Sequence, residues 1–208
     1  MLLRCPNWLA FVEGISELRS WRSSAGTTYY FEDWWGGGLS KAQRFPVRLP
    51  GDKLVYAPHY YTPAVYPADY FYGPNQAELP DAALKENVIG TFDSMFGYLS
   101  SAAPNQAMVL GEFGGLYTTD RHPAKTIQRV LRYTVDLMLQ RRFAGGYVWS
   151  LNPESGYGYN PGKTEGFFQE GLVSLDWRSA NEPYLAALQA MDSLPDLKPL
   201  RCFTSSSP

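Results

Sequence analysis

Residues 107–115 read Ala-Met-Val-Leu-Gly-Glu-Phe-Gly-Gly, and this stretch decides the fold that we predict. Its first four residues form a short apolar run, which ends at Gly111 and Glu112. A run of this length, apolar on both faces and bounded by glycine, is typical of a buried strand in a parallel sheet. The glycines around Glu112 leave room for other groups to approach it closely. We therefore predict a parallel strand that presents a carboxylate at its C-terminal end.

Three further apolar runs of the same kind, at residues 8–12, 53–57 and 145–149, flank this one along the chain. Helical spacing of apolar residues lies between or after them, whereas residues 23–50 show neither period clearly and are predicted to form a long, largely irregular connection. An alternation of strands and helices predicts an α/β fold with a parallel sheet. The helical patterns are Leu84, Val88, Phe92, Met95 and Leu99; Ile127, Val130, Leu131, Val135 and Met138; and Tyr184, Leu188 and Met191.

Each predicted strand ends at a polar or aromatic residue: Glu13, His59, Glu112 and Trp149. In a (β/α)8 barrel the active site is built at the C-terminal ends of the strands. An open, doubly wound sheet also binds ligands there, so this pattern fits both folds. No Gly-x-Gly-x-x-Gly or phosphate-loop motif follows any strand, which disfavours nucleotide binding. We therefore favour the barrel.

Composition limits the classes of function. The 208 residues suit one domain, and a net charge of −2 with only 18% charged residues does not favour nucleic-acid or membrane-surface binding. No apolar run approaches 18 residues, so no membrane span is predicted, and residues 1–6 lack the features of a signal peptide. Aromatic residues, 15% of the chain, are frequent in polar stretches, which fits either sugar stacking or a protein-binding surface. Cys5 and Cys202 either form one bridge or are unrelated thiols.

The chain resembles glycoside hydrolase family 5, the cellulase family, over nearly its whole length. Five segments occur in the order that they have in that family, which makes the resemblance specific. The five are Trp8-Leu-Ala-Phe-Val-Glu-Gly14; Trp34-Trp35-Gly-Gly-Gly38; Leu54-Val-Tyr-Ala-Pro-His-Tyr-Tyr61; Val109-Leu-Gly-Glu-Phe-Gly-Gly115; and Trp149-Ser-Leu-Asn-Pro-Glu-Ser-Gly156, the last of which is followed by Gly171-Leu-Val-Ser-Leu-Asp-Trp177. The resemblance implies barrel strands five to eight with their helices, in other words the C-terminal half of a TIM barrel. Residues 1–200 would be a partial catalytic domain, and residues 201–208 the start of a Ser-rich linker or tail.

The resemblance also implies roles for individual residues. Glu112 would be the nucleophile of a retaining glycosidase, which needs a second carboxyl group about 5 Å away as acid and base. Tyr61 would hold Glu112 in its ionised form, and His59 would orient the acid–base network. Trp149 would stack on the reacting sugar, and Trp34 or Trp35 on a neighbouring one. Glu13 would support these groups without taking part in bond cleavage.

Several assignments have a structural alternative. Glu112, beside glycines, could belong to a structural turn; His59 could be a core histidine; and Trp34 and Trp35 could pack into the barrel rim. His122 is expected on the surface at a helix start, and Glu154 and Glu170 are expected in solvated loops. Asn181-Glu182-Pro183 has the letters of the family's acid motif but follows the last predicted strand, where Asn, Glu and Pro are ordinary helix-opening residues.

The general acid belongs to the half of the barrel that this chain does not match, so we expect the isolated chain to be a poor catalyst. The parent protein is expected to be a secreted, monomeric hydrolase of β-linked polysaccharide, of the cellulose or β-1,4-glucan type. No metal-ligand spacing is present, and the reaction needs no cofactor. Two alternatives are a non-catalytic carbohydrate-binding remnant and an inactive, truncated fragment. Leu151 departs from the family pattern, as does the insert at residues 157–168.

Overall fold

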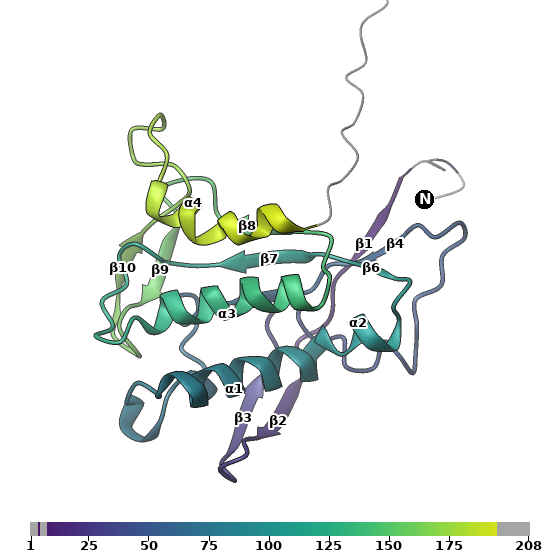
Figure 1. Ribbon diagram of the computed structural model, residues 1–208, viewed down its shortest axis with the longest axis horizontal. Coiled ribbons are helices and arrows are strands. Elements are labelled where there is room, and N and C mark those ends of the chain that lie inside the picture. The colour runs from purple at the N-terminus through teal and green to yellow at the C-terminus, as the bar shows by residue number, and fades with distance from the viewer. Residues whose placement is uncertain (1–3, 5–7, 195–208) are drawn as a thin grey trace, which may run out of the picture.

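The parallel strands form one series in chain order. The computed structural model describes residue 4 and residues 8–194 (Figure 1). Strand β1 pairs with β4 and β4 with β6, while β5 pairs with β7 and β7 with β8, all in parallel. Pro58 lacks an N–H and separates β4 from β5, so these two act as one interrupted strand. The strands are β1 (Ala10–Val12), β4 (Leu54–Tyr56), β5 (His59–Tyr61), β6 (Ala107–Met108), β7 (Leu110–Gly114) and β8 (Gly146–Trp149).

This order separates the two folds left open by the sequence. A doubly wound sheet reverses its strand order at a switch point. The described parallel strands instead follow the chain order throughout, as they do in a (β/α)8 barrel. The predicted alternation of parallel strands and helices is confirmed, and the arrangement is that of part of a barrel.

Two antiparallel hairpins are added to this series. Residues 23–50 are largely irregular, as predicted, except for β3 (Thr28–Glu32), which pairs with β2 (Leu18–Arg22). The alternation of buried and exposed residues in this hairpin extends over only five residues in each strand, too few to stand out in the sequence. The second hairpin, β9 (Gly156–Tyr159) with β10 (Glu165–Gln169), lies in the insert that follows β8.

The helices begin and end close to the predicted positions. Leu84, Val88 and Phe92 lie on the buried face of α1, and Figure 1 shows α1 beside α3. The chain continues from α1 through a π-helical turn into α2, so the apolar spacing up to Leu99 is continuous. The helices are α1 (Asp81–Phe92), α2 (Leu99–Ala102), α3 (Thr126–Gln140) and α4 (Glu182–Leu188), with the π turn η3 (Asp93–Gly97) and 3-10 turns η1 (Asp69–Phe71), η2 (Pro74–Gln76) and η4 (Gln189–Ser193).

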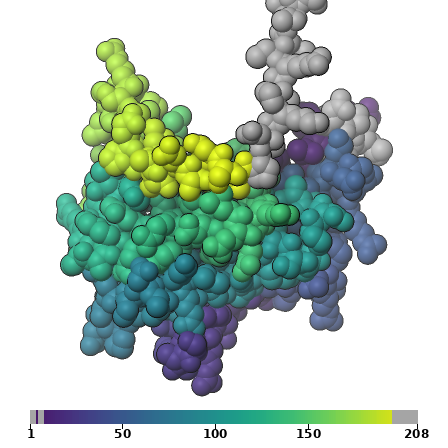
Figure 2. Space-filling model, in the orientation of Figure 1, coloured from purple at the N-terminus to yellow at the C-terminus, as the bar shows by residue number. Residues whose placement is uncertain are grey.

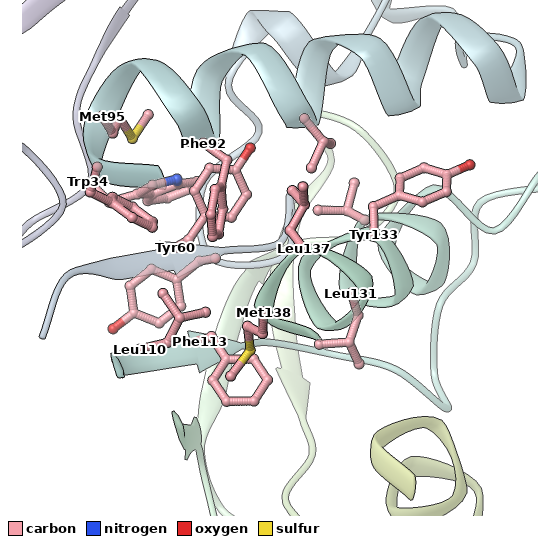
Figure 3. Close-up of a cluster of buried hydrophobic side chains, with 14 of the residues drawn as sticks. Trp34, Tyr60, Phe92, Met95, Leu110, Phe113, Leu131, Tyr133, Leu137 and Met138 are labelled. Carbon is pink, nitrogen blue, oxygen red and sulfur yellow. The ribbon is translucent and has the colours of Figure 1, made fainter. Parts of the chain in front are cut away.

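The core lies between the strands and the helices. Figure 3 shows Tyr60 and Phe113, from β5 and β7, directed toward the helices that carry Phe92 and Met138. All four side chains are buried. Because side chains alternate along a strand, the neighbours of Tyr60 and Phe113 point to the opposite face of the sheet. His59, Tyr61 and Glu112 are therefore on one common face.

That opposite face is partly open. Phe11 on β1 and Tyr147 on β8 are both exposed, and their rings meet edge to face with centroids 6.4 Å apart. Residues that point into a complete barrel are packed in layers. The exposure of these two rings on the inner face is consistent with part of a barrel.

Some sequence predictions fall outside the described residues. Cys5, Cys202 and the proposed boundary near residue 201 are among them. Within the described part of the chain, no helix has the length and apolar character needed to cross a membrane.

Candidate active site

Strand register brings Glu112 next to the His59-Tyr60-Tyr61 segment. In the β5–β7 ladder His59 is paired with Glu112, and Tyr61 with Gly114. The Tyr61 hydroxyl donates a hydrogen bond to Oε2 of Glu112. About a third of the Glu112 side chain is exposed, so the carboxylate combines a fixed orientation with access from solvent. A carboxylate that is both oriented and accessible can act as a nucleophile.

The environment of Tyr61 keeps its hydroxyl protonated. Burial raises the pKa of Tyr61 well above its ordinary value, and the hydrogen bond to the Glu112 carboxylate raises it further. A phenol that stays protonated remains a hydrogen-bond donor to the Glu112 carboxylate, so it holds that carboxylate in a fixed orientation.

His59 lies between two carboxylates. Its Nδ1 is 3.8 Å from Oε2 of Glu112, and its Nε2 is 3.5 Å from Oε1 of Glu13, at the end of β1. The side chain of Glu13 is more than half exposed, whereas His59 is buried. Gly36 makes this packing possible, because its φ is +78° and a Cβ there would lie 3.0 Å from the imidazole ring. The loop that contains Trp34 and Trp35 therefore covers His59.

The two adjacent tryptophans have different environments. Trp34 is 8% exposed and packs edge to face against Tyr60 and Tyr61, which matches the rim-packing interpretation. Trp35 is 83% exposed, so its ring remains free to meet a ligand. Of the two predicted stacking platforms, Trp35 is the one whose ring is accessible to a sugar.

Trp149 ends β8, next to the end of β7. It pairs with Gly114, two residues after Glu112, and 46% of its surface is exposed. The Tyr157 hydroxyl donates to the backbone carbonyl of Trp149 at 3.1 Å, and the peptide bond from Trp149 to Ser150 is cis. An exposed indole beside the Glu112 strand is well placed to stack on a sugar ring.

The expectation that His122 lies on the surface is wrong. It is buried, with its Nδ1 2.7 Å from Oδ1 of Asp120 and its Nε2 3.0 Å from the Tyr72 hydroxyl. The backbone N–H of Gly162 also donates to Nε2. These partners, apart from Asp120, are 40 or more residues away along the chain, so no local pattern could reveal them.

The expectation that Glu170 is solvated is also wrong. Glu170 is 6% exposed, and its carboxylate accepts several hydrogen bonds from the segment that follows β7. Asn181, which precedes α4 as predicted, makes no capping hydrogen bond and instead donates to Glu170 at 2.9 Å. Glu154, by contrast, is exposed as predicted. Across the described residues, no group of three or more His, Cys, Asp or Glu could hold a metal ion.

Comparisons with known proteins are consistent with this geometry. A family model described as Cellulase (glycosyl hydrolase family 5) matches residues 5–155. The major extracellular endoglucanase of Xanthomonas campestris pv. campestris is 29% identical over 191 residues, which cover 92% of this chain and 33% of that protein. An endoglucanase of Paenibacillus polymyxa is 32% identical, with coverage of 86% and 37%. The chain thus spans about a third of the length of these relatives.

Solved structures give the same result. The catalytic domain of the Xanthomonas campestris enzyme superposes with a TM-score of 0.67 at 27% identity, covering 91% of this chain and 46% of that one. A variant of an endocellulase from Pyrococcus horikoshii, solved in complex with cellotetraose, has a TM-score of 0.66 at 32% identity, with coverage of 92% and 45%. These neighbours are catalytic domains with the TIM-barrel fold, of which this chain matches just under half.

Proposed function

This chain belongs to glycosyl hydrolase family 5, the cellulase family, and on that premise we propose that it acts in the hydrolysis of β-linked polysaccharide with Glu112 as the nucleophile of a retaining mechanism. The observation that carries the proposal is the hydrogen bond from Tyr61 to a strand-end carboxylate that is still open to solvent. The substrate that we propose is a β-1,4-glucan, since the relatives named above are endoglucanases and one was solved with cellotetraose.

The chemistry divides between two carboxyl groups. Glu112 attacks the anomeric carbon and forms a glycosyl ester, while an acid protonates the departing oxygen; water then cleaves the ester. Tyr61 orients the attacking carboxylate, and His59, between Glu13 and Glu112, orients the polar network around it. Trp149 supplies a platform for the reacting sugar, and Trp35 one for a neighbouring unit.

We further propose that the parallel strands of this chain are barrel strands five to eight, so that residues 1–200 correspond to the C-terminal half of a catalytic domain. The coverage of just under half of the solved neighbours supports this, as does the exposure of Phe11 and Tyr147 on the inner face. In this proposal the acid comes from the half of the barrel that the chain does not match. Loss of general-acid assistance costs about 10²–10⁴ in rate, so hydrolysis of unactivated glucan by the chain alone is expected to be slow. The Xanthomonas relative is described as extracellular, which supports our proposal that the parent protein is secreted. We also propose that the parent protein is monomeric.

An activated substrate tests the nucleophile separately from the acid. A 2,4-dinitrophenyl 2-deoxy-2-fluoro-β-cellobioside carries a leaving group that departs as the phenolate without protonation, and its fluorine slows hydrolysis of the glycosyl ester. As the bond from C1 to a Glu112 oxygen forms, the bond from C1 to the phenolate oxygen breaks. We expect one equivalent of dinitrophenolate and a covalent label that peptide mass spectrometry locates on Glu112.

Matched variants complete the test. Glu112→Gln should abolish labelling, whereas Glu165→Gln, at an exposed position on β10, should label as the wild type does. Labelling at another carboxylate, or none, would contradict the assignment of Glu112. The exposed rings of Trp35 and Trp149 also fit a second candidate function, that of a non-catalytic carbohydrate-binding module. Binding of cello-oligosaccharides without any labelling would favour that candidate.

A further inference from the structure

A buried carboxylate outside the reacting groups holds the loop that follows the Glu112 strand. The Glu170 carboxylate accepts hydrogen bonds from the backbone N–H groups of Tyr117 at 2.9 Å, Thr118 at 2.7 Å and Thr119 at 3.3 Å. The Thr119 hydroxyl donates to it at 3.0 Å, and the Asn181 side-chain amide at 2.9 Å. All of these partners are uncharged donors, and several of them come from one short stretch of backbone.

These donors keep Glu170 ionised. Burial opposes ionisation, but the hydrogen bonds from Thr118, Tyr117 and Asn181 outweigh it and hold the pKa of Glu170 below its ordinary value. Residues 117–119 lie outside the strand ladders, so their N–H groups need acceptors from elsewhere. Glu170 supplies them, and it fixes the position of that backbone in doing so.

The segment next to Glu170 is attached to the other side of the site. The Glu170 N–H donates to the carbonyl of Ser155, and the Leu172 N–H donates to the carbonyl of Ser150, the residue after Trp149. Gly171 packs so closely on this segment that a Cβ would lie 2.3 Å from the carbonyl oxygen of Asn152. Glu170 therefore joins the loop after β7, which follows Glu112, to the loop after β8, which follows Trp149. Figure 2 shows the yellow-green loop between β10 and α4 as a lobe that rises from the body of the molecule beside α4.

The start of α4 completes this network. Asn181 donates to the carbonyl of Gly171 at 3.0 Å and accepts from the Thr118 hydroxyl at 3.0 Å. The Tyr184 hydroxyl donates to the carbonyl of Gly115, three residues after Glu112. Asn181 thus connects the two loops through the same carboxylate, in a role that its place at a helix start does not suggest.

We propose that Glu170 is a positioning residue that sets the distance and angle between the Glu112 carboxylate and the Trp149 ring by holding the loops after β7 and β8 together. This inference rests on the proposed function, in which these two side chains meet the same sugar. A misplacement of about 1 Å between reacting groups can cost about 100-fold in rate, so a residue that never touches the sugar can still control the reaction.

The substitution Glu170→Gln tests this role without a large change in volume. A carboxylate only accepts hydrogen bonds, whereas a glutamine amide has one accepting oxygen and one donating nitrogen. Because every partner of the Glu170 carboxylate is a donor, the new NH₂ group faces N–H or O–H groups, and the 117–119 loop has to move away from it. Glu165→Gln, the same change at an exposed position of the neighbouring strand, is the matched control.

The readout is single-turnover labelling of the 208-residue chain with the fluorinated dinitrophenyl cellobioside. The amplitude of the dinitrophenolate burst measures the fraction of competent molecules, and the saturating rate constant measures how well each competent molecule reacts. We expect Glu170→Gln to keep nearly full amplitude at temperatures well below its unfolding midpoint, and to lower the saturating rate constant by about 10- to 100-fold. The control should change neither.

Each other outcome overturns either the inference about Glu170 or the proposed function. If Glu170→Gln lowers the amplitude but leaves the rate constant unchanged, or changes neither, Glu170 is only a structural residue and the inference is overturned. If the wild-type chain takes no label at Glu112, the proposed function is overturned, and the inference that rests on it as well. If Glu170→Gln does not fold, Asn181→Ala tests the inference instead, because it removes one of the donors to the Glu170 carboxylate. This variant should also lower the rate constant, by a smaller factor. An unchanged rate constant would overturn the inference.

Discussion

The buried carboxyl of Asp33 should make the stability of this protein depend on pH in an unusual direction. Asp33 directly precedes Trp34 and is 2% exposed. Its Oδ1 lies 3.3 Å from Nε of Arg19, yet neither carboxylate oxygen accepts a hydrogen bond from a described residue. Burial raises the pKa of Asp33 from 3.8 to about 7; Arg19 lowers it and Glu17 raises it slightly, and burial prevails.

The direction of this pH dependence of stability follows from proton binding. Between pH 3.8 and pH 7 the folded state holds a proton on Asp33 that the unfolded chain has released. Stability then falls as the pH rises. The contribution is fully present below pH 3.8 and is lost by the time the pH passes 7. A shift of about three pKa units at 1.36 kcal/mol per unit corresponds to a loss of about 4 kcal/mol in the free energy of unfolding.

The substitution Asp33→Asn removes this titration while keeping the shape of the side chain. Urea unfolding followed by tryptophan fluorescence, at steps from pH 4 to pH 8, gives the free energy of unfolding of both proteins. We expect the variant to gain about 4 kcal/mol relative to the wild type between the two ends of this range. Asp52→Asn, at an exposed aspartate, should run parallel to the wild type. A constant difference between the wild type and Asp33→Asn across this pH range would refute the reasoning.

Two further substitutions test the site. Gly36→Ala places a Cβ 3.0 Å from the His59 ring at a φ of +78°, so it should lower the free energy of unfolding by about 1–2 kcal/mol and also slow the labelling of Glu112. Gly26→Ala is the matched control, because Gly26 has a φ of +86° but only the end of the Arg22 side chain lies nearby, at 3.6 Å. It should lose similar stability but label normally. Equal labelling rates of the two variants would contradict the role of the loop that covers His59. Trp149→Ala should weaken binding of cello-oligosaccharides about tenfold in isothermal titration calorimetry, or about 1.4 kcal/mol, because a stacking surface is lost. Tyr30→Ala, which removes an exposed ring from β3, is the control and should leave the affinity unchanged. An unaltered affinity of Trp149→Ala would contradict the proposal that Trp149 stacks on a sugar.

Apolar periodicity was enough to predict the framework that carries the site. The spacing of Leu84, Val88 and Phe92 matches the buried face of α1, and the run before Glu112 matches β6 and β7. The spacing of two residues between His59 and Tyr61 places them on the same face of a strand whatever the rest of the chain does. These features depend on interactions between residues close in sequence, which is why a local pattern determines them.

Other features depend on partners that are distant in the chain. Trp34 and Trp35 are the same residue type at adjacent positions, yet their environments differ. The fold places Tyr60 and Tyr61 against Trp34, which is buried, and leaves Trp35 exposed. His122 and Glu170 look like solvated residues in the sequence, but donors and acceptors about 40 to 50 residues away bury them.

The sequence by itself determined the parallel strands, the helices and the face on which Glu112, Tyr61 and His59 lie, because the repeat of a strand or helix sets the direction of each side chain. Only the tertiary structure decided which polar side chains are buried and which groups they form hydrogen bonds with. Burial of a charge is tolerated where enough hydrogen-bond donors converge on it. For Glu170 those donors come from residues 117–119 and from Asn181, two segments that only the folded chain brings together.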